Sequence, residues 1–221
     1  MTIQEAIIQR HSVRSYENKP IEADTLQALK NVIEECNEES GLHIQLVTNE
    51  PKAFNSAMAH YGQFSGVTNY IALIGKKDAS LEEKCGYYGE KIVLEAQRLG
   101  LNTCWVALTY KKIASAYEIL PDEKLTVVIT VGYGTTQGVP HKSKDITVLS
   151  NITPESPDWF RSGMEAVLLA PTAVNQQKFY FALMQDHVIA NPGRGFYTKM
   201  DLGIAKYHFE IGSGKSSEVW A

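Results

Sequence analysis

The chain has 221 residues, a formal net charge of −4 at pH 7 and a sequence pI of about 5.9. Hydrophobic residues make up 44% of the chain and charged residues 21%, which is ordinary for a globular protein. This balance argues against a general nucleic-acid binder, because such proteins carry a strong positive charge. The longest apolar runs, such as residues 127–131, are far shorter than the ~20 residues that cross a bilayer, so no membrane span is expected.

The cysteines and histidines indicate no disulfide framework and no metal site. Cys36, Cys85 and Cys104 are odd in number and widely spaced, which favours reduced thiols. The histidines show no metal-ligand spacing such as His-Glu-x-x-His. Residues 1–5 lack the basic and apolar regions of a signal peptide. We therefore expect a cytoplasmic protein without a metal.

The first part of the chain is predicted to alternate between helices and strands, from apolar residues that recur at helical or alternating spacing. A capping box at Ser80 and Glu83 and a glycine at position 100 would bound one long helix. The other helices are expected at 3–9, 22–38, from Pro51 and at 111–118. Strands are expected at 43–48, 70–74, 103–107 and 125–133, before an irregular glycine-rich loop.

The second part starts again in the same style. A helix begins near 153–157 and stops at Pro171, and a polar turn at 172–177 leads into a strand at 179–184. A loop at 191–195, a last helix over 202–211 closed by Gly212 and a flexible polar tail follow. The order helix, turn, strand and long helix occurs in both parts. Internal duplication with a junction near 150–154 explains this order, and so does chance recurrence of common elements.

Several familiar motifs are excluded. Residues 209–216 end like a phosphate-binding P-loop, but Phe209 stands where that loop requires glycine. Residues 132–138 follow a strand with the wrong spacing for a dinucleotide-binding fingerprint. No Gly-x-Ser-x-Gly elbow is present. The sequence therefore favours neither a nucleotide hydrolase nor a Ser hydrolase.

Two short basic runs have the composition of a phosphate site. Arg10–Arg14 and His141–Lys144 both mix cations with hydroxyls where the chain leaves regular structure. The alternative is that basic residues interact with the negative end of a preceding helix. A third segment, 93–106, runs from a helix through Gly100 into an apolar strand. It is explained by core packing, or by main-chain contacts from the strand to a flat ring.

Four motifs together resemble the FMN-dependent nitroreductase family. They are Arg-x-Ser-x-Arg followed by Tyr16 and Lys19-Pro20-Ile21, Ala-x-x-Leu-Gly-Leu-x-Thr-Cys-Trp at 96–105, Lys-x-Lys after Val-Gly-Tyr-Gly, and Ala-Pro-Thr-Ala-Val-Asn-Gln-Gln at 170–177. The resemblance implies an α+β fold with a mixed, mainly antiparallel central sheet flanked by helices.

The position of the last motif departs from the ordinary family, where it closely follows the amino-terminal basic run. Here it lies in the second part of the chain, as in a short, single-chain branch of the family. That branch implies an internally duplicated pseudo-dimer and hence a monomer. Residues 1–150 would carry the FMN phosphate site, and residues 151–221 would supply a turn that contacts the flavin ring.

The resemblance also assigns roles to individual residues. The implied phosphate ligands are Arg10, His11, Ser12, Lys142 and Lys144. The implied ring contacts are Cys104, Trp105, Val106, Pro171, Thr172, Ala173 and Asn175. Arg14 would lie at the N1–C2=O edge of the flavin, where a cation stabilises negative charge. The alternatives are a surface ion pair of Arg14 with Glu17, a core position for Trp105 and a simple turn-forming role for Asn175.

The implied activity is hydride transfer from NAD(P)H through flavin N5 to a small electron acceptor such as a nitroaromatic or a quinone. No catalytic side chain is required, because the flavin carries the reactivity. The alternative is a protein that binds or sequesters flavin with little turnover.

Overall fold

The computed structural model describes residues 1–221 and divides into two compact units, each drawn from separate stretches of chain. The sheet unit consists of residues 9–81 and 91–140, and the hairpin unit of residues 1–8, 82–90 and 141–221. From the sequence, we expect residues 1–150 to carry the phosphate site and residues 151–221 to supply the ring-contacting turn. That division by function stays a prediction. No helix combines the length and the apolar character that crossing a membrane would need.

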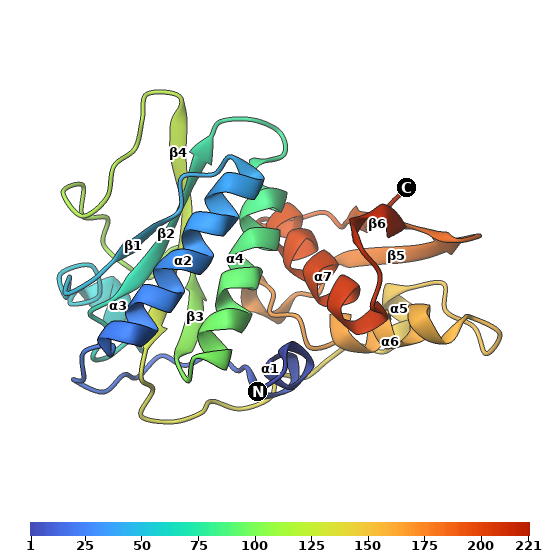
Figure 1. Cartoon of the computed structure of the whole chain (residues 1–221), viewed down its shortest axis with the longest axis horizontal. Helices are drawn as coiled ribbons and strands as arrows, with labels where there is room; N and C mark the ends of the chain where they lie inside the picture. Colours follow the sequence, from blue (N-terminus) through green and yellow to red (C-terminus); the bar gives the residue numbers. More distant parts are fainter. The chain divides into compact units, whose positions relative to one another are not determined.

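The sheet unit is built on four antiparallel strands in the order β1-β2-β4-β3 (Figure 1). The long strand β4 pairs with β2 on one side and with β3 on the other. The strands are β1 (Gln45–Val47), β2 (Tyr70–Lys76), β3 (Asn102–Val106) and β4 (Glu123–Gly132). This antiparallel sheet with its helices confirms the predicted α+β class.

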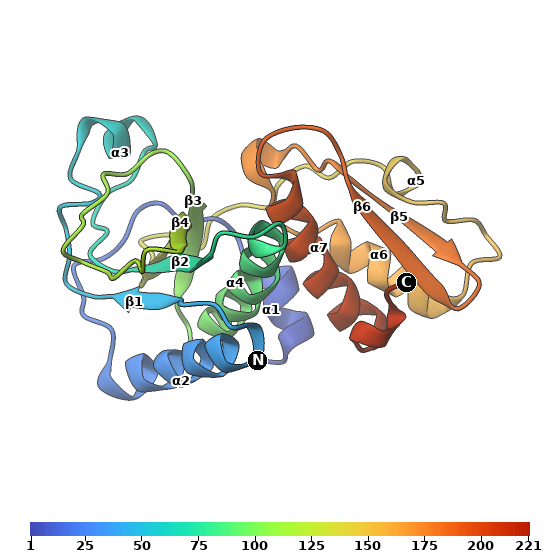
Figure 2. The same cartoon turned by 90° about the horizontal axis from the view of Figure 1, so that it is seen from above.

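Helices cover both faces of this sheet. α2 (Ala23–Ser40) and the short α3 (Ala57–Tyr61) lie on opposite sides of it in Figure 2. Tyr70, Ala72 and Ile74 of β2 belong to one core cluster with the residues around α3. Because side chains alternate along a strand, the residues between them face α2. The carboxyl-terminal half of α4 (Leu81–Arg98) belongs to the same unit.

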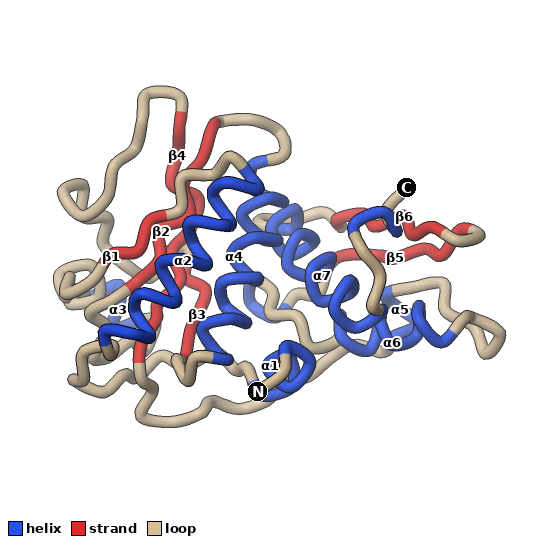
Figure 3. The backbone as a smooth tube through the Cα atoms, in the orientation of Figure 1, coloured by secondary structure: helices blue, strands red, loops and turns tan.

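Three predictions in the sheet unit are wrong. No helix starts at Pro51; α3 begins six residues later, where the Ser56 side chain accepts a bond from the Ala59 N–H. Residues 111–118 form a loop between β3 and β4 (Figure 3). The apolar side chains of this loop pack against the core cluster, which competes with their helical pairing. Ser80 makes no capping box, because its hydroxyl donates to Asp78 Oδ1.

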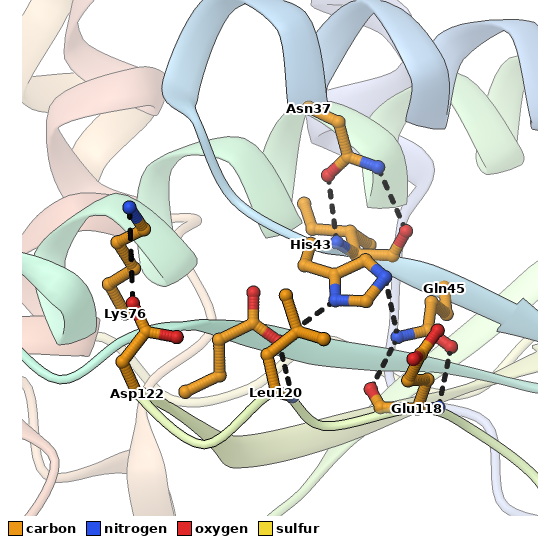
Figure 4. Close-up of polar contacts among 9 residues, drawn as sticks. Asn37, His43, Gln45, Lys76, Glu118, Leu120 and Asp122 are labelled. Atoms are coloured by element: carbon orange, nitrogen blue, oxygen red, sulfur yellow. Dashed lines mark hydrogen bonds and ion pairs between the residues drawn. The ribbon is translucent and has the colours of Figure 1, made fainter.

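The end of that long loop is fastened to the sheet by polar side chains (Figure 4). Gln45 donates through Nε2 to Glu118 O at 2.7 Å and accepts from Glu118 N at 2.9 Å. His43 Nδ1 lies 2.9 Å from Glu123 Oε2, and the same carboxylate oxygen accepts from Leu120 N at 3.0 Å. These bonds replace the helical hydrogen bonds that the sequence pattern predicted.

The hairpin unit packs α6 (Asp158–Val167) and α7 (Thr198–Ser213) beside the antiparallel hairpin of β5 (Phe179–Met184) and β6 (His187–Pro192). Phe181 of β5 stacks on Phe209 of α7 with ring centroids 5.6 Å apart. The smaller elements are α1 (Ile3–Gln9), α5 (Ile146–Leu149) and the 3-10 turns η1 (Ala173–Asn175) and η2 (Ser217–Val219).

Three features of this unit differ from the sequence-based prediction. β6 occupies residues where turn-forming Asn191 and Pro192 indicated only a loop. α7 starts earlier than expected, runs through Gly212 and ends before Gly214, whose φ of 66° closes it. The tail is not a free polar segment, because Trp220 Nε1 donates to Glu210 Oε1 at 2.6 Å and Trp220 bridges to β6.

Candidate functional site

Two predicted site segments lie side by side in the sheet unit. Ser12 forms an isolated parallel bridge with Thr103, and Val13 N donates to Thr103 O at 3.0 Å. The basic run Arg10–Arg14 therefore extends the edge of β3, next to Cys104. Gly138 also lies against this run, because a Cβ built there would be 2.7 Å from His11 Cβ and 2.9 Å from Ser12 O.

Positive charge converges on this edge of the sheet. Arg10 is only 4% exposed, and Arg14 is exposed. Burial raises the pKa of the Cys104 thiol, whereas Arg14, the Ser12 hydroxyl and Arg10 act to lower it. Both guanidinium groups are thus close enough to act on the same side chain. Arg14 makes no ion pair with Glu17, so the alternative of a surface pair is not observed.

The β3 residues divide by exposure. The side chains of Cys104 and Val106 are buried in the core cluster, so only their main chain and the half-buried Trp105 are available at the surface. Thr130 Oγ1 donates to Cys104 O at 3.3 Å. The core-packing explanation therefore holds for two of the three side chains.

The other predicted segments meet in the hairpin unit. Asn175 Nδ2 donates to Lys142 O at 2.8 Å, and Lys144 N donates to Gln177 Oε1 at 2.8 Å. Lys144 Nζ donates to the main-chain oxygens of Gln176 and Gln177 at 2.7 and 3.0 Å. By contrast, the exposed Lys142 ammonium forms no hydrogen bond or ion pair. The two lysines therefore differ: Lys144 fastens the turn, and Lys142 is available to a ligand.

The turn itself has a strained backbone. Val174, Asn175 and Gln177 have φ angles of 46°, 54° and 44°, in the left-handed region that favours glycine. Each such residue costs about 1–3 kcal/mol, and a β-branched one is rarest there. Pro171, Thr172 and Ala173, directly before these strained residues, are half-buried, and Thr172 Oγ1 accepts a bond from Gln177 N at 3.1 Å. Strain of this kind is typical of functional sites and persists only where neighbours hold it.

Asp201 holds this turn from α7, and sequence reasoning missed it. Its Oδ1 accepts from Ala173 N at 2.9 Å, and its Oδ2 accepts from Gln176 Nε2 at 2.7 Å. The residue is 2% exposed. The signal that could have found it is a single acid between Met200 and Leu202 on an otherwise apolar helix face.

Burial raises the pKa of Asp201 to about 6, although both hydrogen bonds act to lower it. The unfolded carboxyl has a pKa of about 3.9. Because folding raises the pKa, the stability from this group is complete below about pH 4 and is lost as the pH rises through about 6. The ionised side chain at pH 7 therefore costs the fold about 3 kcal/mol.

The predicted site residues thus fall into two sets, each assembled inside one unit. The sheet unit holds Arg10, His11, Ser12, Arg14, Cys104, Trp105 and Val106. The hairpin unit holds Lys142, Lys144, Pro171, Thr172, Ala173 and Asn175. No group of three or more His, Cys, Asp or Glu side chains is arranged to hold a metal ion. Asn175 accepts from Gln177 Nε2 within the turn and donates to Lys142 O outside it, so its amide links the turn to the basic run.

Comparison with known proteins gives a family and a fold. The model of a family described as "Putative TM nitroreductase" matches residues 2–213. A Thermotoga maritima structure described as a nitroreductase is similar with a TM-score of 0.68 and 23% identity, over 96% of this chain and 83% of its own. No curated protein sequence matches the chain significantly.

Two further solved structures share the fold over a smaller part of this chain. A Bacteroides thetaiotaomicron protein described as an NADH dehydrogenase/NAD(P)H nitroreductase has a TM-score of 0.52 and 20% identity, over 70% of this chain and 98% of its own. A Desulfovibrio desulfuricans structure described as a nitroreductase in complex with FMN has a TM-score of 0.52 and 16% identity, over 71% of this chain and 98% of its own. These likenesses show that the chain has the nitroreductase fold.

Proposed function

This chain belongs to the nitroreductase family whose model matches residues 2–213, and from that premise we propose that it is an FMN-dependent oxidoreductase. The family match across nearly the whole chain is the observation that carries the proposal. The FMN in the Desulfovibrio desulfuricans structure supports the choice of cofactor. The description of the Bacteroides thetaiotaomicron protein supports NAD(P)H as the electron donor.

The residues of the sheet unit fit an anionic flavin nucleotide. Arg10 brings one positive charge to the edge of β3 for the phosphate, Arg14 brings a second for the ring edge, and the run between them contains no acid. A phosphate monoester carries about −1.5 to −2 charge at neutral pH and takes several hydrogen bonds. Arginine forks and hydroxyls are the donors that such a group prefers. Ser12 and His11 supply the remaining polar groups on this run.

The protein's part in the proposed reaction is to bind and to position. When bound, FMN would supply the hydride chemistry, taking the hydride from NAD(P)H and passing it to a nitroaromatic or quinone acceptor. Arg14 would stabilise negative charge on the ring edge and so raise the reduction potential. Trp105 and the turn 172–177 would border the ring. Lys142, whose ammonium is uncommitted, is the better phosphate ligand of the two lysines.

We expect the purified protein to bind FMN and to lose its absorbance near about 450 nm when NADH or NADPH is added without oxygen. Stopped-flow spectroscopy measures the rate, and free FMN with the same donor is the control. Restoration of the absorbance by a nitroaromatic or a quinone would complete the cycle. Bound FMN that neither donor reduces would contradict the oxidoreductase and favour flavin storage.

The two lysines of the hairpin unit should respond differently to the same substitution. Lys144→Met should lower the free energy of unfolding by about 1 kcal/mol, because it removes two hydrogen bonds to main-chain oxygens at a partly exposed site. Lys142→Met should leave stability unchanged and weaken FMN binding about tenfold. Urea unfolding and flavin fluorescence titration measure the two effects. Equal FMN affinities in Lys142→Met and wild type would remove Lys142 from the phosphate site.

A further inference from the structure

We propose that Asp201 is the positioning residue of the flavin site, acting by holding the turn 172–177 in the conformation that contacts the ring. This role rests on the proposed function. Asp201 itself would contact the turn and not the flavin. Asp201 lies in the first turn of α7 and reaches the turn through both carboxylate oxygens.

The hydrogen bonds at this position favour an ionised carboxylate. Gln176 Nε2 donates to Asp201 Oδ2 at 2.7 Å and to Phe196 O at 2.9 Å, so both amide hydrogens are used. Turning the amide over would place Gln176 Oε1 against the Phe196 carbonyl, so its orientation is fixed. The main-chain N–H of Ala173 is a donor as well. Asp201 must therefore accept at both oxygens, and the carboxylate does this better than the neutral acid, whose hydroxyl oxygen is a weak acceptor.

Asp201 is buried and forms no ion pair. Lys144, which contacts the turn, bonds to main-chain oxygens. Lys178 approaches Gly195, and Glu82 of α4 acts on Tyr197. None of these groups bonds to Asp201, and burial dominates its environment. A side chain kept only for stability would be neutral here, since an ionised Asp201 lowers the stability of the fold at neutral pH.

The conformation that Asp201 holds is one that the turn would not keep unaided. Val174 and Asn175 are in the left-handed region directly between the two residues that Asp201 binds. The Val174 side chain is 81% exposed, so packing does not hold it there. The carboxylate therefore supplies a restraint on the strained backbone, as the strain at a functional site requires.

Asp201→Asn tests the proposal, because it replaces one acceptor oxygen by a donor at nearly constant volume. We expect about tenfold weaker binding of FMN and of riboflavin at pH 8, measured by flavin fluorescence quenching. Hydrogen exchange at the Ala173 amide should accelerate by a similar factor. The urea midpoint should not fall, because the substitution also removes a buried charge. A residue that only stabilised the fold would lower flavin binding and the urea midpoint together, so a loss of binding alone indicates a role in the site.

The pH dependence gives a second readout. Protonation of Asp201 would weaken its hydrogen bonds from Ala173 N and Gln176 Nε2 and so loosen the turn. Riboflavin binding to the wild type should therefore weaken as the pH falls through about 6. Riboflavin is the probe here because the FMN phosphate itself titrates near about pH 6. In Asp201→Asn this pH dependence should disappear.

Two further variants keep the test decisive. Asp158→Asn removes the same charge from the exposed first turn of α6 and should change neither binding nor exchange at Ala173. Gln176→Met removes the turn's side-chain donor and keeps Asp201, so it should weaken riboflavin binding in the same direction by a smaller factor, even if Asp201→Asn folds poorly.

The outcomes separate this inference from the proposed function. A wild-type protein that binds neither FMN nor riboflavin would overturn both. A wild-type protein that binds FMN, with equal affinity in Asp201→Asn and in Gln176→Met, would overturn the role of Asp201 alone. That role would also be overturned if Asp201→Asn weakened binding only in proportion to a lowered urea midpoint.

Discussion

Replacing Gly203 by alanine should lower the free energy of unfolding by about 3 kcal/mol, although alanine is the better helix former by about 1 kcal/mol. A Cβ at this position in α7 would lie 2.0 Å from Glu83 O of α4. Gly86 has the reciprocal geometry, with a built Cβ 2.0 Å from Met200 O. A main-chain oxygen cannot move aside as a flexible side chain can. The two helix backbones would have to separate, which loosens the first turns of α7 and therefore Asp201.

Urea unfolding with a constant m-value measures this effect. Gly214→Ala, just after the carboxyl-terminal end of the same helix, is the control, because its built Cβ meets nothing within 4 Å and only its φ of 66° opposes alanine. That substitution should cost about 1 kcal/mol. Gly86→Ala combined with Gly203→Ala should cost less than the sum, since both relieve the same close approach. A stabilised Gly203→Ala protein would show that the helices do not cross so closely.

The regular elements could largely be predicted from the sequence because local patterns determine them. The apolar stripe of α2 and the buried run of β2 need no knowledge of distant residues, and β5 begins and ends where its pattern predicts. The errors occur where a distant contact outweighs the local pattern. Residues 111–118 have a helical pattern, but Gln45 binds the main chain of Glu118 and the core takes the apolar side chains. β6 contains turn-forming residues and is held by pairing with β5.

Some residues of the candidate site could likewise be predicted from local sequence, and others could not. Charge and hydroxyl content pointed to the run Arg10–Arg14, and the structure lays this run beside β3. The sequence could not distinguish Lys142 from Lys144, because the carbonyls that bind Lys144 lie more than thirty residues away. Asp201 left only the faint signal of one acid in an apolar stretch. Its partners, Ala173 and Gln176, become visible only once the fold places the turn against α7.

A buried contact between a histidine of α7 and a glutamate of α4 should affect stability more than any other single side chain in the hairpin unit. His208 and Glu90 are both 0% exposed, and His208 Nε2 lies 2.9 Å from Glu90 Oε1. His208 Nδ1 lies 3.0 Å from Ala166 O and must carry a hydrogen, because a carbonyl only accepts. His208→Leu should therefore lower the free energy of unfolding by about 3–5 kcal/mol, since it leaves a buried acid without this partner.

The reason for so large an effect is the acid left behind and not the attraction that is lost. Replacing both members, His208→Leu with Glu90→Leu, should thus be less destabilising than His208→Leu alone. His187→Leu, at an exposed position on β6, is the control and should change stability by less than about 0.5 kcal/mol. Urea unfolding of the wild type, His208→Leu, Glu90→Leu and the double variant forms a double-mutant cycle, and His187→Leu is measured beside it. Additive losses in the cycle would mean that His208 and Glu90 are not coupled, and the pair would then not be what joins α7 to α4 and α6.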